Sequence, residues 1–137
     1  MIKIIKRGWN LLQSATRDLR AKRKRSPKWR ILQKYFLLKN NECAACGSKK
    51  QLQVHHILPF DDYPELELQE SNLITLCMSE KDCHLLIAHG GNFRRYCPNV
   101  KKYVDQLKKK QKTFEEIHKI AQQERLDNRE QNKTNKF

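Results

Sequence analysis

The chain has 137 residues, enough for one domain, and carries 29 lysines and arginines against 15 acidic residues, a formal net charge of +14. This excess predicts a polyanionic partner, namely DNA, RNA or an anionic membrane surface, although a merely soluble or ribosome-associated basic protein has the same composition. No apolar run of about 20 residues is present, which excludes a transmembrane helix, and the start MIKIIKRGW lacks a secretory signal pattern, so we expect an intracellular protein.

The first 25 residues are basic and follow a helical pattern. Their apolar side chains share one helical face, at Ile2, Ile5, Trp9, Leu12 and Leu19. The cations gather toward the end of the segment, at Arg20, Lys22, Arg23, Lys24 and Arg25. Three interpretations stay open: a solvated helix packed loosely on the domain, an arm that binds phosphates, or a membrane-surface helix or targeting peptide, with membrane contact the least favoured.

A helix is predicted for residues 28–38. Ser26 suits the capping position before this helix, and Pro27 suits its first turn, where a missing N–H costs nothing. The large residues at helical spacing are expected in the core rather than stacked on bases, and they are Trp29, Leu32, Tyr35 or Phe36, and Leu38.

Two short strands and a helix are predicted in the middle of the chain. Residues 51–58 largely alternate between apolar and polar side chains, and residues 72–77 form a second run of strand length. The pattern of residues 81–88 predicts the start of a helix, which Gly90 and Gly91 break. This order of strand, loop, strand and helix lets the helix pack across the strand pair.

The remainder of the chain is helical in pattern from Val100 onward. Thr113-Phe114-Glu115-Glu116 matches a capping box, which predicts the start of a further helix there. After about Glu124 the sequence is polar, and we expect this tail to fray.

Four of the five cysteines come in two pairs. Two residues separate Cys43 from Cys46, and five separate Cys77 from Cys83. Four thiolates from two turns suit a tetrahedral Zn²⁺, and a chain with a small core gains stability from such a staple. A reducing compartment favours metal over disulfides, and four unrelated buried cysteines are the remaining alternative. We therefore predict that the four paired cysteines bind a structural zinc ion and that Cys97 is not a ligand.

Four of the five histidines lie in one stretch of the middle region. His55 and His56 are neighbours on a predicted strand, so their side chains point to opposite faces. Two roles are therefore expected: one of the two binds metal and the other handles protons, for which imidazole is suited at pH 7. His84 begins the predicted helix, which brings it beside His55, and His89 follows five residues later.

Together these elements resemble a known family. The strings HHI-x-P, NLI-x-LC and CH, after C-x2-CG, are similar to those of HNH nucleases, over about a third of the chain (43–90). Residues 64–100 also resemble small HNH proteins of bacteriophages and their hosts. The resemblance implies an α+β fold with a small ββα-metal (His-Me finger) core and a four-cysteine zinc knuckle, flanked by N- and C-terminal helices. We expect a basic arm at 1–25, the HNH domain at 26–112, and a C-terminal helix and tail at 113–137.

The resemblance also implies a role for each residue of the motif. His56 would be the general base that activates water, and Asn72 would orient the His56 ring through a hydrogen bond. His55 and His84 would bind a catalytic divalent metal such as Mg²⁺, Mn²⁺, Ni²⁺ or Zn²⁺. His89 is left as an optional third ligand, because colicin-type relatives have a histidine at an interval of four where this chain has five.

The implied function is that of a metal-dependent DNA endonuclease that nicks or cuts both strands, in the cytoplasm of a bacterium or of a phage-infected host. Arg94, Arg95 and the basic arm are candidates for holding the DNA backbone, although such an arginine pair is as often a solvated surface. Two rivals remain. One is a zinc-dependent nucleic-acid-binding module that cuts nothing, and the other is an accessory subunit of a phage packaging or defence machine, with phage or host proteins as partners.

Overall fold

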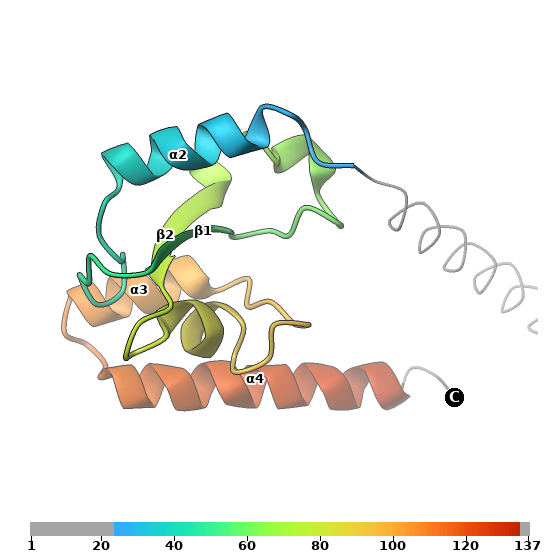
Figure 1. Ribbon diagram of the computed structural model, residues 1–137. Coiled ribbons are helices and arrows are strands. Elements are labelled where there is room, and N and C mark those ends of the chain that lie inside the picture. The colour runs from blue at the N-terminus through green and yellow to red at the C-terminus, as the bar shows by residue number, and fades with distance from the viewer. Residues whose placement is uncertain (1–23, 135–137) are drawn as a thin grey trace, which may run out of the picture.

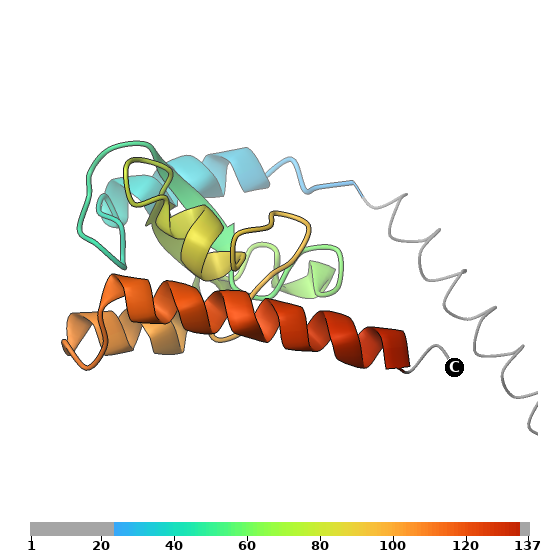
Figure 2. The ribbon, with the colours of Figure 1, turned by 90° about the horizontal axis from the view of Figure 1, so that it is seen from below.

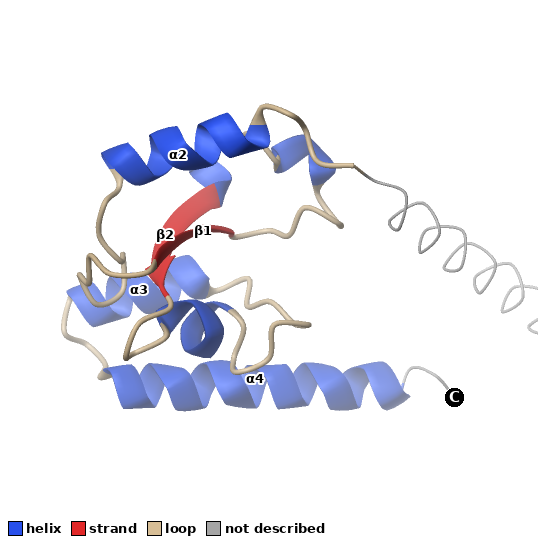
Figure 3. Cartoon of the chain, viewed as in Figure 1, coloured by secondary structure: helices blue, strands red, loops and turns tan. Residues whose placement is uncertain are grey.

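Residues 24–134 are described by the computed structural model and form a mixed α+β fold, as predicted. Its helices and strands are α2 (Trp29–Lys39), β1 (Leu52–His56), β2 (Leu73–Cys77), α3 (Val100–Lys108) and α4 (Phe114–Thr134) (Figure 1). Two 3₁₀ turns, η1 (Pro64–Leu66) and η2 (Glu70–Asn72), precede β2, and a π-helix, η3 (His84–Ala88), follows it. The two strands and η3 are the predicted ββα unit, and helices flank the small sheet (Figure 3).

The sheet is the middle one of three layers. β1 and β2 pair antiparallel, with Leu52 opposite Cys77 and His56 opposite Leu73. α2 covers one face of the sheet, whereas η3, α3 and α4 lie on the other, as the ribbon seen from below also shows (Figures 1 and 2). Because side chains alternate along a strand, neighbouring residues of β1 enter different layers.

Each face of the sheet has its own hydrophobic core. The core under α2 consists of Trp29, Phe36, Val54 and Leu73. The larger core, on the other face, includes the buried residues Cys43, Cys77, Cys83 and Cys97, with Cys46 partly buried against them. It joins these cysteines to residues of the sheet, η3, α3 and α4, among them Ile74, Leu76, Ile87, Val100, Tyr103, Val104, Ile117 and Ala121. The helices after residue 100 therefore share one core with the sheet and the cysteines.

Ser26 was predicted to cap α2, but the N-cap is Lys28, which makes no side-chain hydrogen bond there, and Ser26 instead bonds the turn that leads into the helix. The backbone N–H of Lys28 donates to the Ser26 hydroxyl at 3.2 Å, and the N–H of Trp29 donates to the Ser26 carbonyl at 3.0 Å. Ser26 thus satisfies two N–H groups that a helix start otherwise leaves unbonded. The regular helix begins at Trp29, one residue later than predicted.

The buried face of α2 is narrower than predicted. Trp29 and Phe36 are buried, as expected, but Leu38 is 78% exposed and the prediction that it is buried is wrong. Tyr35 follows Ile31 by four residues and Leu38 follows Tyr35 by three, so all three exposed side chains share the helix face turned away from the sheet. α2 packs on the sheet through one face only, and no other element covers its opposite face within the described residues.

The start of α4 has the reciprocal contacts of a capping box. The N–H of Thr113 donates to Glu116 Oε2 at 2.7 Å, and the N–H of Glu116 donates to Thr113 Oγ1 at 3.3 Å. The helix continues to Thr134, so the expected fraying after Glu124 is wrong; the residues there are mostly strong helix formers. Within residues 24–134, no helix combines the length and the apolar character that a membrane crossing requires.

Candidate functional site

Four cysteines meet inside the larger core. Cys43 and Cys46 lie on a tight turn, at whose end Gly47 takes a φ of 75°, a conformation that glycine adopts without strain. Cys77 ends β2, and Cys83 directly precedes η3. The four sulfurs lie within 4.8 Å of one another, and Cys77 and Cys83 are fully buried. The cluster therefore ties the turn, the sheet and η3 together.

The thiols of this cluster compete for protons. A hydrogen bond from Cys83 lowers the pKa of Cys43 to about 4 and raises the pKa of Cys83 itself, while burial raises the pKa of Cys46 to about 11. Cys46 and Cys77 approach to 3.6 Å between sulfurs, and all four cysteines are free of disulfides. Buried thiols crowded in this way suit a divalent cation, which replaces their protons. The donor set is that of a structural zinc site.

Three histidines converge between the sheet and η3. His55 projects from β1 toward η3, and its Nδ1 lies 3.1 Å from Nε2 of His84, as the order of elements led us to expect. His89, directly after η3, places its Nε2 3.3 Å from the same His84 nitrogen. The three candidate ligand atoms lie within 4.8 Å of one another, so the structure brings together all three histidines of the predicted metal site.

The π-helical turn explains how His89 reaches the cluster. In an α-helix, residues four apart share a face, and a fifth residue turns away from it. The wider i→i+5 turn of η3 aligns His84 with His89, so the helix does not need to unwind as the interval of five suggested. Gly90 ends the turn at a φ of 57°, and a Cβ there would lie 2.6 Å from the Ala121 carbonyl oxygen of α4. α4 therefore fixes the end of η3.

The three imidazoles offer lone pairs rather than positive charge. Burial is the main cause that lowers the pKa of His55 to about 2 and that of His84 to about 4. His89 Nδ1 contacts the Arg95 carbonyl, which requires an N–H on Nδ1 and leaves the lone pair of Nε2 facing the other rings. Neutral rings that face one another in this way fit a divalent cation, which accepts all three lone pairs.

His56 lies on the opposite face of β1 from His55, as predicted. Its ring stacks on Trp29 with centroids 4.3 Å apart, and its Nε2–H donates to the carbonyl of Glu67 at 3.0 Å. This hydrogen bond selects the tautomer in which Nδ1 carries the lone pair. Burial lowers the pKa of His56 below its ordinary value, so the ring is a neutral proton acceptor at pH 7.

Asn72 does not orient His56 through a hydrogen bond. Its Oδ1 accepts the N–H of Leu58 at 2.9 Å, and its Nδ2 donates to the Leu58 carbonyl at 3.0 Å. Both amide atoms are therefore used on the backbone that follows β1, where the two strands separate. The orienting group is instead the carbonyl of Glu67, which sequence reasoning missed because a backbone carbonyl carries no signal in a motif.

The arginine pair lies in the loop that follows the histidine cluster. Arg94 and Arg95 are exposed, and the Arg95 carbonyl holds His89. Phe93, just before them, places its ring 5.1 Å from that of His89 and 5.5 Å from that of His84. The loop thus packs against the cluster and leaves both guanidinium groups at the surface beside it.

The other predicted DNA contacts belong to the basic segment before α2. Arg20, Lys22 and Arg23 lie outside the described residues, and Lys24 is exposed. The guanidinium of Arg25 already has internal partners, since it lies against a carboxylate and two aromatic rings.

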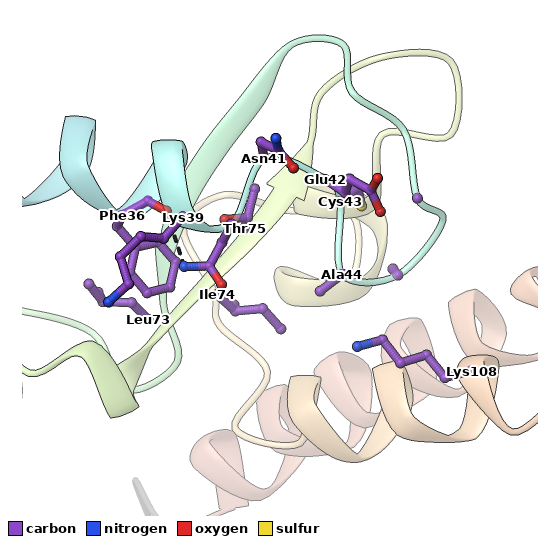
Figure 4. A pocket seen from close by; sticks show the side chains of 13 residues that line it. Phe36, Lys39, Asn41, Glu42, Cys43, Ala44, Leu73, Ile74, Thr75 and Lys108 are labelled. Carbon is purple, nitrogen blue, oxygen red and sulfur yellow. Dashed lines mark hydrogen bonds between the residues drawn. The ribbon is translucent and has the colours of Figure 1, made fainter.

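An open hollow of about 490 Å³ lies beside the cysteine cluster. It is bounded by the C-terminal end of α2 with Phe36 and Lys39, by β2, and by the cysteine turn, and Lys108 reaches toward it from α3 (Figure 4). No histidine lines this hollow. The hollow therefore borders the cysteine cluster through Cys43, whereas the histidines suited to proton transfer lie elsewhere.

Comparison with known proteins agrees with this geometry. The family model of the HNH endonuclease matches residues 43–88. This stretch is an HNH domain. The HNH domain begins at the first cysteine of the cluster and ends one residue before His89, which confirms the resemblance of the motif and points to nuclease activity in general, with nucleic acid as partner. No curated protein and no solved structure matches the chain.

Proposed function

We propose that the protein is a metal-dependent DNA endonuclease that hydrolyses phosphodiester bonds with His56 as general base. The observation that carries this proposal is the division between two neighbouring histidines. His55 joins a three-nitrogen donor set, whereas His56 stands apart from that set with one nitrogen held by a carbonyl and the other carrying a lone pair. Hydrolysis needs both kinds of group, a proton acceptor for the water and a cation for the phosphate.

The proposed metal ligands are His55, His84 and His89. A divalent cation such as Mg²⁺, Mn²⁺, Ni²⁺ or Zn²⁺, when bound there, supplies positive charge to the phosphate oxygens and to the leaving 3′-oxygen. Three protein ligands leave open positions for substrate. The zinc site at the four cysteines has a structural role, because it fixes η3 against the sheet and so brings His84 to His55.

The proposed step for His56 is the acceptance of a proton. Nδ1 takes a proton from water while the water oxygen bonds to phosphorus. The bond from phosphorus to the 3′-oxygen breaks, and the 3′-oxygen leaves with the bonding electrons and takes a proton from solvent water. The Glu67 carbonyl, as acceptor of the Nε2–H, holds the ring and stabilises the imidazolium that forms. Asn72 is proposed to act through Leu58, by holding the loop on which the Glu67 carbonyl lies.

The test is incubation of the purified protein with supercoiled plasmid in a series of divalent metals. We expect nicked or linear DNA with at least one metal, and neither product from His56→Gln. His118→Ala, which changes the one histidine outside both groups, is the matched control and should cut like the wild type. A folded wild-type protein that binds plasmid but leaves it intact with every metal contradicts the proposal and favours the binding module or the accessory subunit.

DNA binding is expected to depend steeply on salt and to weaken when residues 1–23 are removed. Each neutralised phosphate contributes about −0.9 to the slope of log affinity against log salt on duplex DNA. Removal of residues 1–23 deletes seven lysines and arginines, among them Arg20, Lys22 and Arg23, so the slope should become less negative. Fluorescence anisotropy of a labelled duplex across a salt series measures both quantities. If affinity and slope are both unchanged, the arm does not contact DNA, and the interpretation as a packed helix or a membrane-surface helix is favoured instead.

A further inference from the structure

The loop after η3 is closed by backbone hydrogen bonds. The N–H of Cys97 donates to the Ala88 carbonyl at 2.7 Å. The N–H of Asn92 donates to the carbonyl of His89, a proposed metal ligand, at 3.2 Å. The two ends of the segment 92–96 are therefore attached to η3, and this segment, which we call the aromatic loop, has a defined position beside the histidine cluster.

Phe93, in the aromatic loop, divides its ring between the histidines and solvent. The ring centroid lies 5.1 Å from that of His89 and 5.5 Å from that of His84, with interplanar angles of 60° and 65°. The residue is nevertheless 49% exposed. A single exposed apolar side chain needs no explanation by itself. This one, however, contacts two proposed metal ligands on one side and presents the rest of a flat ring to solvent at the same site.

Two cations accompany the ring in the aromatic loop. Arg94 and Arg95 are exposed and follow Phe93 directly. The N–H of Arg94 donates to Asn92 Oδ1 at 2.9 Å, and the N–H of Arg95 donates to the Asn92 carbonyl at 2.9 Å, so the backbone that carries both guanidinium groups is held in a turn. An aromatic ring for stacking, beside cations for the phosphates, is the combination by which proteins bind single-stranded nucleic acid.

We propose that Phe93 stacks on an unpaired base of the DNA next to the phosphate that the histidines bind, and that Arg94 and Arg95 contact phosphates of the same strand. This inference rests on the proposed function for its partner and names the class of substrate: single-stranded DNA, or duplex DNA with an unpaired base at the cut. A base can stack on a side chain only after it leaves the helical stack, which costs less where the base is already unpaired. A supercoiled plasmid also offers such bases, because negative supercoiling favours local opening of the duplex.

The test is the affinity of the full chain, without added divalent metal, for a labelled oligonucleotide as a single strand and as an intact duplex. Phe93→Leu keeps an apolar side chain against the histidines but removes the ring. We expect about tenfold weaker binding of the single strand, within the range that loss of one base–aromatic stack costs, and at most about a twofold change for the duplex. Phe93→Tyr, which keeps a ring, should retain the affinity for the single strand. Tyr35→Leu is the matched control, because Tyr35 is an exposed ring, at 55% exposure, on α2 across the sheet from η3, and it should leave both affinities unchanged (Figure 1).

Three results overturn the proposal: an equal loss for both forms of DNA, a loss in Phe93→Tyr as large as in Phe93→Leu, or no loss at all. Should Phe93→Leu unfold, the wild-type protein is irradiated with a single strand that carries 5-iododeoxyuridine, and the crosslinked peptide should contain Phe93. Crosslinks confined to other peptides overturn the proposal as well. Neither measurement needs cutting. A protein that gives the expected affinities but cuts nothing therefore contradicts the proposed function alone, whereas an active enzyme whose affinities do not depend on the ring contradicts this inference alone.

Discussion

Replacement of Cys43 by serine is expected to abolish zinc binding and most of the folded structure. Cys43, Cys77 and Cys83 lie inside the larger core, where a serine and three remaining thiols cannot satisfy a tetrahedral ion. Structural zinc sites contribute about 10–16 kcal/mol in small peptides, whereas a whole domain is stable by only about 5–15 kcal/mol. Loss of the zinc therefore removes about as much free energy as the fold has available.

The measurement combines zinc content with circular dichroism during heating. The wild type should keep about one zinc per chain after dialysis against a weak chelator, which strips the weaker histidine site. Cys97→Ser is the matched control: Cys97 is also buried, at 5% exposure, but stands outside the cluster, so this variant should keep its zinc and its cooperative unfolding. A folded, zinc-free wild type, or equal damage from the two substitutions, contradicts the assignment.

The sequence predicted those parts of the site that depend only on the spacing of residues within one strand or one turn. Strand alternation placed His55 and His56 on opposite faces, and the structure gives them separate partners, His84 for the first and Glu67 for the second. The paired cysteines were recognisable because ligand pairs on tight turns keep a short spacing. The order of elements also predicted the ββα unit, since a helix after two paired strands packs across them.

The rest of the site depends on contacts that no local pattern records. The third histidine reaches the cluster through a π-helical turn, and that turn is held in place by α4, where Gly90 meets Ala121. Such a turn is rare and has no sequence signature. Asn72 was expected at the His56 ring, but its amide pairs with Leu58 because the strands separate there and leave that backbone unbonded. Tertiary packing decides both features.

The substitutions His56→Ala and His84→Ala are expected to abolish most cutting for different reasons. His56 is not a member of the three-nitrogen donor set, so its loss removes the proton acceptor and should lower the rate about 10² to 10⁴-fold with little change in DNA affinity. His84 is the central member of the set, with a nitrogen near both His55 and His89, so its loss weakens metal affinity. Excess metal should therefore restore part of the activity of His84→Ala and none of that of His56→Ala.

Titration of Mn²⁺ or Ni²⁺ against the cutting rate of each variant measures this difference. Because His56 also packs on Trp29, His56→Gln accompanies the alanine variant: its amide can still donate to the Glu67 carbonyl, and it keeps more of the buried volume, yet it is no base at pH 7. Both His56 variants should stay inactive at every metal concentration. If metal rescues His56→Ala but not His84→Ala, His56 is the metal ligand and His84 the general base. If both variants cut as fast as the wild type, the activity comes from a contaminant. Partial rescue of His84→Ala alone assigns metal binding to His84 and proton transfer to His56, whose side chain points to the opposite face of β1 from that of His55.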